Sequence, residues 1–273
     1  MGRVAAPQGD RAFTPALAKA WLTPVYDLTN ALFTRERTWR RAVVRAANLA
    51  PGDHLIDVGC GTGTLLRDLM ISCPQAGLAG VEPDPAALAI ARRKFVFGAI
   101  ASGLAHLHRY GCIHCDVKPQ NVFVSIEREE CVLGDFGLVQ PDAATALSQQ
   151  EYIVTSWYRP PELVFDVARR YDTKVDMWSL GCVLAEMILG EPLFIVTAQT
   201  SVLAHQCSAF SLPCGIYSYN SLCHLETQAS MHSWLRRKFE GSEHTGPSEE
   251  EWTLLGETLQ FDAKKRSSAS FMA

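Results

Sequence analysis

The sequence has little that would mark it for a membrane or for secretion. Its most apolar stretch, residues 95–107, is interrupted by Gly98, Ser102, Gly103 and His106. That stretch is shorter than the roughly 20 residues that a membrane-spanning helix needs. The N-terminus lacks the basic start and apolar run of a signal peptide. We therefore expect no membrane partner and an intracellular protein of the cytoplasm or nucleus.

An excess of charge of one sign is also missing. The 25 basic and 29 acidic residues give a formal net charge of -4 and are mixed along the chain. Proteins that bind nucleic-acid phosphates usually concentrate basic residues on one face. We therefore expect no nucleic-acid partner.

The nine cysteines have no repeated spacing. An odd, scattered set favours reduced thiols over a disulfide framework. Cys112 and Cys115 form a single C-x-x-C, and one further group holds residue types that can bind zinc: His205, Cys207, Cys214, Cys223 and His224. Neither has the paired knuckles of a structural zinc site, so buried thiols are the simpler interpretation.

Patterns typical of helices and strands alternate in the first third of the chain. Residues 31–49 place apolar positions at helical spacing among arginines, which predicts an amphipathic helix. The apolar run 54–58 predicts a buried strand, followed by a glycine-rich turn, a helix over about 64–71 and a second strand over 77–81. Strand, glycine turn, helix and strand make half of a doubly wound sheet.

Farther along, helical patterns dominate. No capping residue or proline interrupts the sequence from Pro85 to Tyr110, which predicts one continuous helix across it. Apolar residues at 175–189 predict a helix buried on most sides, and helical order is expected again at 249–260. Residues 195–247 have weak periodicity and predict no particular element.

The first group of residues with a chemical meaning lies at the end of the first predicted strand. Asp57 is followed by Gly59, Gly61 and Gly63, where a strand must turn sharply into a helix and a ligand can approach the backbone. Glu82 lies 23 positions after Gly59 (82 − 59), at the end of the second strand, where an acidic residue can accept hydrogen bonds from ribose hydroxyls. Another Rossmann-type unit or a purely structural glycine turn remains an alternative.

The strings D-V-G-C-G-T-G and G-V-E-P-D-P resemble the class I S-adenosylmethionine-dependent methyltransferases over about residues 20–94. The resemblance implies that Asp57, Gly59, Gly61, Gly63 and Glu82 contact the methionine and ribose parts of S-adenosylmethionine. After residue 94 the sequence has no further strands of such a sheet, no adenine pocket and no substrate motif. The methyltransferase-like part is therefore expected to be incomplete.

The second group combines H-C-D-V-K-P-Q-N, residues 114–121, with D-F-G fourteen residues after Asn121 (135 − 121). Phosphoryl transfer to a hydroxyl needs a carboxylate that orients the acceptor, and oxygen ligands for magnesium. Asp116 suits the first role, and Asn121 and Asp135 suit the second. Lys118 is placed to meet the transferring phosphate. Taken singly, each of these residues could be an ordinary turn or surface residue.

These motifs resemble the C-lobe of eukaryotic protein kinases over residues 95–273, together with P-P-E at 160–162 and D-M-W-S-L-G at 176–181. The resemblance implies Mg-ATP as cofactor and a protein substrate. Residues 150–159 are similar to the activation segment of the mitogen-activated group, in which a T-E-Y triplet is phosphorylated. Gln150 replaces that threonine, so only Tyr152 could have this role, and Cys115 replaces the arginine that normally pairs with the phosphate.

The residues before Phe95 contain no kinase glycine-rich lid, no V-A-I-K lysine and no partner glutamate. We therefore predict a mixed α/β chain with a partial Rossmann-like βαβ unit in residues 1–94 and a mainly α-helical kinase C-lobe in residues 95–273. Its expected function is that of a protein serine/threonine kinase, weak or inactive unless a partner replaces the missing N-lobe. The alternatives are a binder of S-adenosylmethionine and a catalytically dead fusion or binding module.

The kinase resemblance also predicts one ion pair. Residues 261–266 are similar to the segment whose arginine pairs with the glutamate of the P-P-E motif, so we expect Glu162 to pair with Arg266. The planar guanidinium fork suits a partly buried carboxylate.

Overall fold

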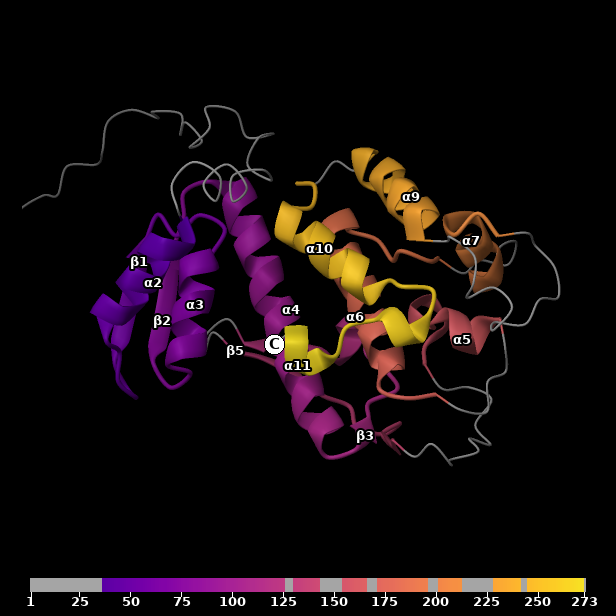
Figure 1. The fold of residues 1–273 in the computed structure, drawn as a ribbon, viewed down its shortest axis with the longest axis horizontal. Helices are drawn as coiled ribbons and strands as arrows, with labels where there is room; N and C mark the ends of the chain where they lie inside the picture. The colour runs from indigo at the N-terminus through magenta and orange to yellow at the C-terminus, as the bar shows by residue number, and fades with distance from the viewer. Residues whose placement is uncertain are drawn as a thin grey trace, which may run out of the picture. The chain divides into compact units, whose positions relative to one another are not determined.

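The computed structural model describes residues 36–125, 130–142, 154–165, 171–195, 201–212, 228–241 and 245–272. The chain forms two compact units, Met1–Ala91 and Arg92–Ala273, which we call the N-terminal and the C-terminal unit. Their boundary falls within helix α4 (Pro85–Arg109), the long helix in Figure 1. Among the described helices, none is long and apolar enough to cross a membrane.

The N-terminal unit contains a parallel pair of strands, β1 (His54–Val58) and β2 (Gly77–Val81). Helix α3 (Thr64–Ser72) connects them, and α2 (Glu36–Ala47) packs on α3 (Figure 1). The predicted strands and the helix after the glycine turn are thus confirmed. The predicted amphipathic helix is confirmed over residues 36–47, while residues 31–35 of that prediction lie outside the described residues. Within the described residues this sheet has two strands.

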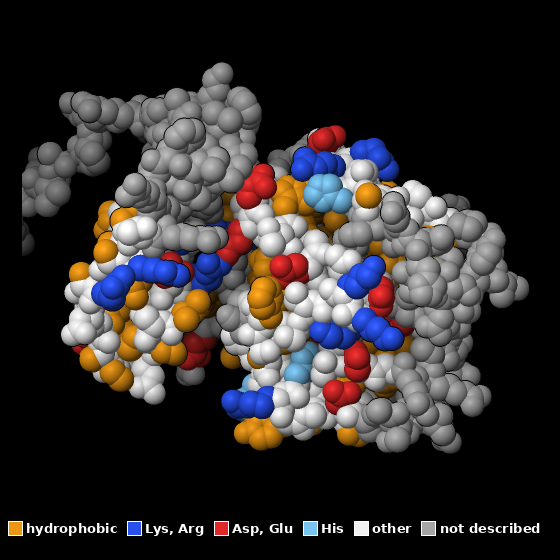
Figure 2. Space-filling model, viewed as in Figure 1, with side chains coloured by type: hydrophobic (Ala, Val, Ile, Leu, Met, Phe, Trp, Pro, Cys, Tyr) orange, Lys and Arg blue, Asp and Glu red, His pale blue; other side chains and the backbone are white. Residues whose placement is uncertain are grey.

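The prediction that the first strand is buried was wrong. Side chains alternate along β1, and Ile56 and Val58 are 67% and 81% exposed, while Val81 on β2 is 56% exposed. Parallel strands are normally covered on both faces. Here one face of the strand pair remains open, and Figure 2 shows hydrophobic side chains at the surface of this unit.

Helix α4 confirms the predicted continuous helix and ends one residue before the expected Tyr110. Gly111 follows with a φ of 67°, and its N–H donates to the carbonyl of His108 at 3.0 Å. Glycine adopts this left-handed conformation without the steric cost that other residues have. The turn after α4 therefore leads directly into the segment with the kinase-like motif.

The core of the C-terminal unit surrounds α6 (Lys174–Leu189), which confirms the helix predicted at 175–189 and its burial. Helix α10 (Glu249–Thr258) packs against it, as Figure 1 shows. The Trp178 ring stacks on Phe194 at 5.8 Å and lies 6.0 Å from Phe210. Large aromatic side chains bury much apolar area, so this cluster is a main source of stability.

Two helices lie in the stretch for which the sequence predicted no element: α7 (Val202–Ala209) and α9 (Gln228–Glu240). Ser201 caps α7 by accepting a hydrogen bond from the Ala204 N–H at 3.2 Å. On α9, Trp234 stacks on Phe194 with their ring centroids 5.7 Å apart. Contacts with distant residues therefore stabilise a helix whose own sequence has weak periodicity.

The remaining described elements are short. They comprise antiparallel pairs and single-turn helices: β3 (Cys112–Ile113) with β6 (Gln140–Pro141), β4 (Val122–Ser125) with β5 (Glu130–Leu133), η2 (Pro119–Asn121), η3 (Ser156–Tyr158), α5 (Pro161–Val164), η4 (Ala263–Lys265) and α11 (Ala269–Met272).

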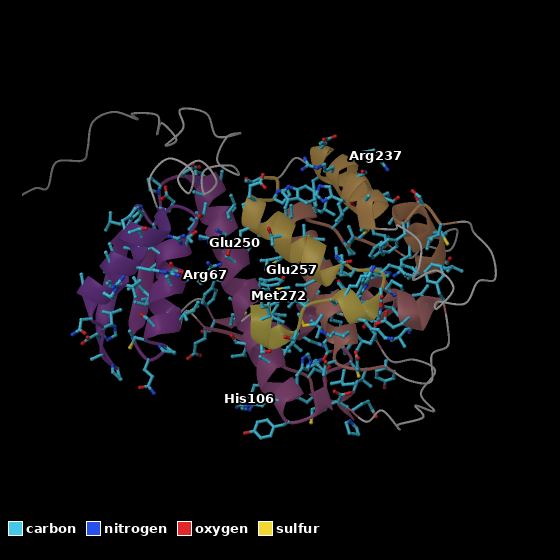
Figure 3. The ribbon with its side chains drawn as sticks, viewed as in Figure 1. Arg67, His106, Arg237, Glu250, Glu257 and Met272 are labelled. Atoms are coloured by element: carbon cyan, nitrogen blue, oxygen red, sulfur yellow. The ribbon has the colours of Figure 1, made fainter. Side chains whose placement is uncertain are left out.

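The predicted ion pair between Glu162 and Arg266 is confirmed. Two guanidinium nitrogens donate to the two carboxylate oxygens at 2.7 Å each, and the Arg266 side chain is fully buried. A second buried pair, which the sequence did not indicate, joins Arg93 on α4 to Glu251 on α10 at 2.6 Å. Beside it, Lys94 pairs with Glu250, which Figure 3 labels near the start of α10. These pairs tie distant parts of the C-terminal unit together.

Candidate functional site

Three of the predicted site residues meet in the segment formed by the loop after β3 and by η2. The ammonium of Lys118 donates to one carboxylate oxygen of Asp116 at 2.7 Å, and the amide nitrogen of Asn121 donates to the same oxygen at 3.0 Å. The hydroxyl of Thr155 donates to the other oxygen at 2.7 Å and accepts from Lys118 at 3.1 Å. Asp116 is therefore fixed by three different side chains.

The loop itself is held by a buried carboxylate of α6. Asp176 accepts hydrogen bonds from the backbone N–H groups of His114 and Cys115 at 2.8 and 2.9 Å, and from the His108 ring at 2.9 Å. The His114 ring contacts the Asp116 N–H through Nδ1 and the Gly134 carbonyl through Nε2. The tautomer with hydrogen on Nε2 satisfies both contacts. A rigid helix thus positions the loop.

Burial alone would raise the pKa of the Asp116 carboxyl, because it disfavours the charged form. Hydrogen bonds from Lys118, Thr155 and Asn121, together with the positive charge of Lys118, outweigh that effect, so the pKa is lowered from its ordinary value. Asp116 is consequently ionised at neutral pH. An ionised carboxylate in this position can accept a hydrogen bond from an incoming hydroxyl group and orient it.

Asp135 lies apart from this network. Its side chain is exposed, its φ is 59°, and its one described hydrogen bond is accepted from the Gly137 N–H at 3.3 Å. The chain just before it is tied to the loop, since the Gly134 N–H donates to the carbonyl of Asn121 at 2.9 Å. Phe136 is 56% exposed and meets the His114 ring edge-on at 5.6 Å.

The donor types at this site fit magnesium. The amide nitrogen of Asn121 donates to Asp116, which leaves its amide oxygen as the atom that could bind a metal, and Asp135 supplies a carboxylate. Magnesium prefers oxygen ligands and commonly completes its coordination with phosphate and water. No group of three or more His, Cys, Asp or Glu side chains suited to a metal occurs in the described residues. A magnesium ion held by Asn121 and Asp135 would share its coordination with the phosphates it accompanies.

Cys115 occupies the position where the resemblance implies an arginine. It is fully buried with a φ of 65°, and burial is the main reason why the pKa of its thiol rises to about 12. The thiol is neutral and brings no positive charge for a phosphate. The backbone carbonyl of Cys115 accepts a hydrogen bond from the Val154 N–H at 3.1 Å. This contact links the described part of the activation segment to the loop. Gln150 and Tyr152 lie outside the described residues.

The five residues predicted to contact S-adenosylmethionine cluster where β1 and β2 end. Gly59, Gly61 and Gly63 all have positive φ, at 80°, 56° and 75°. Glu82 accepts the Gly61 N–H at 2.7 Å with one carboxylate oxygen and the Asp84 N–H at 2.8 Å with the other. In this structure, Glu82 therefore holds the glycine turn closed.

Asp57 shares this negative environment. Burial and then the charge of Glu82 raise the pKa of the Asp57 carboxyl. Gly63 also has a packing role, because a Cβ atom there would lie 3.2 Å from the Cβ of Ala91. A backbone conformation that favours glycine and a close approach thus coincide at this turn.

The comparisons with known proteins agree with the second group of motifs. The family described as "Protein kinase domain" matches residues 72–273, and the chain therefore belongs to the protein kinase family. Over 176 residues it is 32% identical to Cyclin-dependent kinase G1 of Arabidopsis thaliana, which covers 61% of this chain and 28% of that protein. The chain thus spans less than a third of the length of this relative.

Among solved structures, the chain is similar to one chain of the CAK complex from Chaetomium thermophilum bound to ATP-gamma-S. The match has 26% sequence identity and a TM-score of 0.48, and it covers 66% of this chain and 56% of that chain. The family match begins at residue 72, so it includes β2 and the start of α4.

Thr155 is the site residue that sequence reasoning missed as a functional group. It contacts Asp116 across 39 residues of chain. The only signal in the sequence is its place between the D-F-G and P-P-E motifs, two residues before Trp157. That place does not reveal which of several hydroxyl groups in the segment reaches the Asp116 carboxylate.

Proposed function

We propose that the C-terminal unit is the C-lobe of a protein serine/threonine kinase, the lobe that positions the hydroxyl group accepting the phosphate. We also propose that the chain by itself transfers phosphate weakly or not at all. In this proposal Asp116 orients the substrate hydroxyl and accepts its proton, Lys118 meets the transferring phosphate, and Asn121 and Asp135 bind the magnesium of Mg-ATP. The observation that carries the proposal is the network in which Lys118, Asn121 and Thr155 hold an ionised Asp116.

The expected weakness follows from what phosphoryl transfer requires. The rate depends mainly on holding phosphates, metal and hydroxyl in line. The described site residues serve the acceptor and the metal, whereas the sequence before Phe95 has no kinase lysine or glycine-rich lid for the α- and β-phosphates. Loss of one oriented donor typically lowers a rate by about 10² to 10³. Two or three such losses would leave little activity unless a partner replaces the N-lobe.

Transfer of radiolabelled phosphate from ATP to a generic basic protein tests this proposal. We expect the chain to give a signal no higher than the Asp116→Asn variant, in which the general base is lost. The proposal of weakness fails if the unaltered chain shows clear transfer that the variant lacks. Binding of Mg-ATP, measured by calorimetry, tests the site separately: an Asp135→Asn variant should bind more weakly than the unaltered chain if the site is assembled.

We also propose that residues 1–94 derive from a methyltransferase and that residues 95–273 are the kinase-like part. Support for the first comes from the three glycines with positive φ beside Glu82 at the ends of two parallel strands. S-adenosylmethionine would have to displace the Gly61 and Asp84 N–H groups or bind alongside them. Calorimetry with S-adenosylmethionine distinguishes the alternatives, because a catalytically dead fusion or binding module would bind neither this cofactor nor Mg-ATP.

A further inference from the structure

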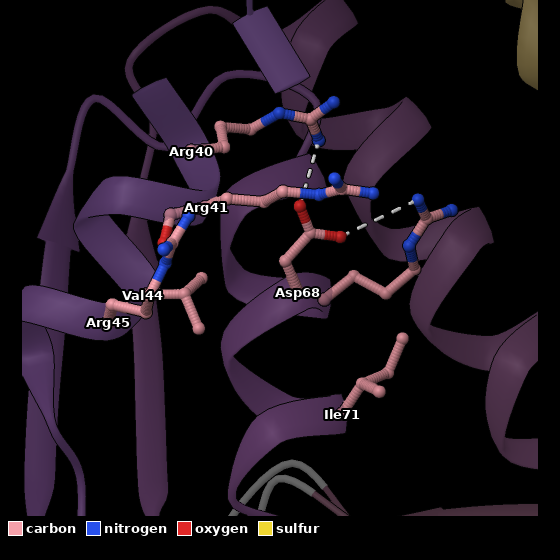
Figure 4. Close-up of a pocket in the computed structure, with 7 residues that line it drawn as sticks. Arg40, Arg41, Val44, Arg45, Asp68 and Ile71 are labelled. Carbon is pink, nitrogen blue, oxygen red and sulfur yellow. Dashed lines mark hydrogen bonds and ion pairs between the residues drawn. The ribbon is translucent and has the colours of Figure 1, made fainter. Parts of the chain in front are cut away.

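An arginine-lined hollow lies on the N-terminal unit. Residues of two helices form it: Arg40, Arg41, Val44 and Arg45 of α2, and Arg67, Asp68 and Ile71 of α3. Figure 4 shows Arg40, Arg41 and Asp68 converging, with Val44 and Ile71 below them in the view. Figure 2 shows a band of basic side chains over the same helices.

The hollow concentrates positive charge in a chain that is acidic overall. Four arginines and one aspartate among its described lining residues give a net charge of +3 (4 − 1), whereas the whole chain carries -4. Asp68 binds Arg40 at 3.3 Å and approaches Arg67 at 3.9 Å. The single carboxylate of Asp68 thus lies near two guanidinium groups and can balance the charge of only one. Arg41 and Arg45 add two further positive charges.

A simple contact between two helices does not need this arrangement. Arg41 and Arg45 are four residues apart on one helix face, where like charges repel each other. The Nε–H of Arg45 donates a hydrogen bond to the backbone carbonyl of Arg41 at 3.2 Å. This hydrogen bond holds the Arg45 side chain against the backbone at Arg41. The side chain of Arg40 is only 11% exposed, so its charge is partly removed from water. Such costs are typical of sites that are shaped for a ligand of opposite charge.

We infer that this hollow binds the diphosphate group of a small molecule. Guanidinium groups can donate paired hydrogen bonds to phosphate oxygens. The negative charge of a diphosphate is also similar in size to the net charge of +3 in the hollow. Val44 and the exposed Ile71 supply an apolar border for the body of the ligand. The described lining residues come from only two short helices, and this small extent suits a compact anion better than the long backbone of a nucleic acid.

Calorimetry with inorganic pyrophosphate in low-salt buffer with EDTA tests this inference. EDTA removes divalent metal, so the kinase-like site cannot contribute metal-dependent binding. We expect saturable binding at one site, weakened at least tenfold in the double variant Arg41→Gln and Arg45→Gln. Inorganic phosphate, with less charge, should bind at least several-fold more weakly than pyrophosphate. Glutamine favours helix, and far-UV circular dichroism will show whether α2 is retained.

The matched control is Arg92→Gln, which removes one charge from an exposed arginine outside the hollow. This variant should bind pyrophosphate as the unaltered chain does. Absence of pyrophosphate binding, or equal affinity in the double variant, would overturn the inference. Binding of a single-stranded oligonucleotide that is lost in the double variant, without saturable binding of pyrophosphate, would also overturn it and would assign the surface to nucleic acid.

Discussion

Asp116 illustrates how a few hydrogen bonds decide the chemistry of one residue. Three side chains donate to its carboxylate, and together they lower its pKa despite its partial burial. Because the folded pKa lies below the unfolded value of about 3.9, ionised Asp116 stabilises the fold at pH values above 3.9. That contribution disappears as the pH falls through the folded pKa. At neutral pH the residue is an ionised but weak base.

The substitution Thr155→Val should raise the pKa of Asp116, because it removes one of the donors that stabilise the charged carboxylate. The carboxyl ¹³C shift of Asp116, followed by NMR as the pH is lowered, measures this directly. Ser156→Ala removes a neighbouring exposed hydroxyl and should leave the titration unchanged. An unaltered titration in Thr155→Val would mean that this contact does not hold Asp116 in solution.

The substitution Glu162→Ala should lower the free energy of unfolding by about 3 to 5 kcal/mol, because it leaves the charge of Arg266 buried without a partner. Urea unfolding followed by tryptophan fluorescence suits the measurement, since Arg266 lies 5.1 Å over the Trp178 ring. Glu249→Ala, at an exposed position in the first turn of α10, is the control and should cost less than about 1 kcal/mol. Equal effects of the two substitutions would contradict the structure.

At the scale of elements, α4 and α6 are helical for different reasons. Alanine-rich sequence favours α4 locally, and no residue in its 25 positions ends it. Most of α6 is buried on all sides, so tertiary packing stabilises it. The glycines of the two units also differ: Gly98 lies in regular helix, whereas Gly63 occupies a left-handed turn.

Gly98→Ala should therefore stabilise the chain by up to about 1 kcal/mol, because alanine lowers the entropy cost of forming helix. Apart from the adjoining residues and the nearby backbone of α4 itself, no atom lies within 4 Å of the new methyl group. Gly63→Ala should instead destabilise by roughly 1 to 2 kcal/mol, since its φ is 75° and Ala91 lies 3.2 Å from the new Cβ. Thermal unfolding of both variants gives the sign of each change. Stabilisation by Gly63→Ala would show that the turn is not formed as described.

At the scale of the whole molecule, the two units differ in how well their centres are protected from water. The described sheet of the N-terminal unit has two strands, and Ile56, Val58 and Val81 on it are exposed. Two strands alone are marginally stable. The C-terminal unit instead has a continuous apolar core around α6. Local opening should therefore differ strongly between the units.

Hydrogen exchange followed by mass spectrometry should show this difference. We expect amides of β1 and β2 to exchange at least tenfold faster than those of α6 between Met177 and Leu189, because their hydrogen bonds lie closer to solvent. Peptides from α10, which packs on α6, serve as the reference within the C-terminal unit. Equal protection of β1 and α6 would mean that something outside the described contacts covers the strand pair.

The sequence by itself determined the features that depend on residues close together in the chain. The glycine turn after β1 and the long helix α4 follow from local conformational preferences, and the group from Asp116 to Asn121 was recognised from a motif a few residues long. The apolar composition of residues 175–189 also predicted helix α6 and its burial, although tertiary packing is what stabilises that helix. The pairing of Glu162 with Arg266 is the exception, since 104 residues separate the partners. It was predictable only because the family resemblance carried that long-range information.

Only the tertiary structure decided what depends on residues far apart. It placed Thr155 on Asp116, paired Arg93 with Glu251, and formed α9 by stacking Trp234 on Phe194. It also left β1 half exposed, where an apolar run had predicted burial. The physical reason is the same in each case. Burial and side-chain hydrogen bonding depend on residues that are distant in the sequence. The pattern of one segment does not show which distant residues pack against it, or whether any do.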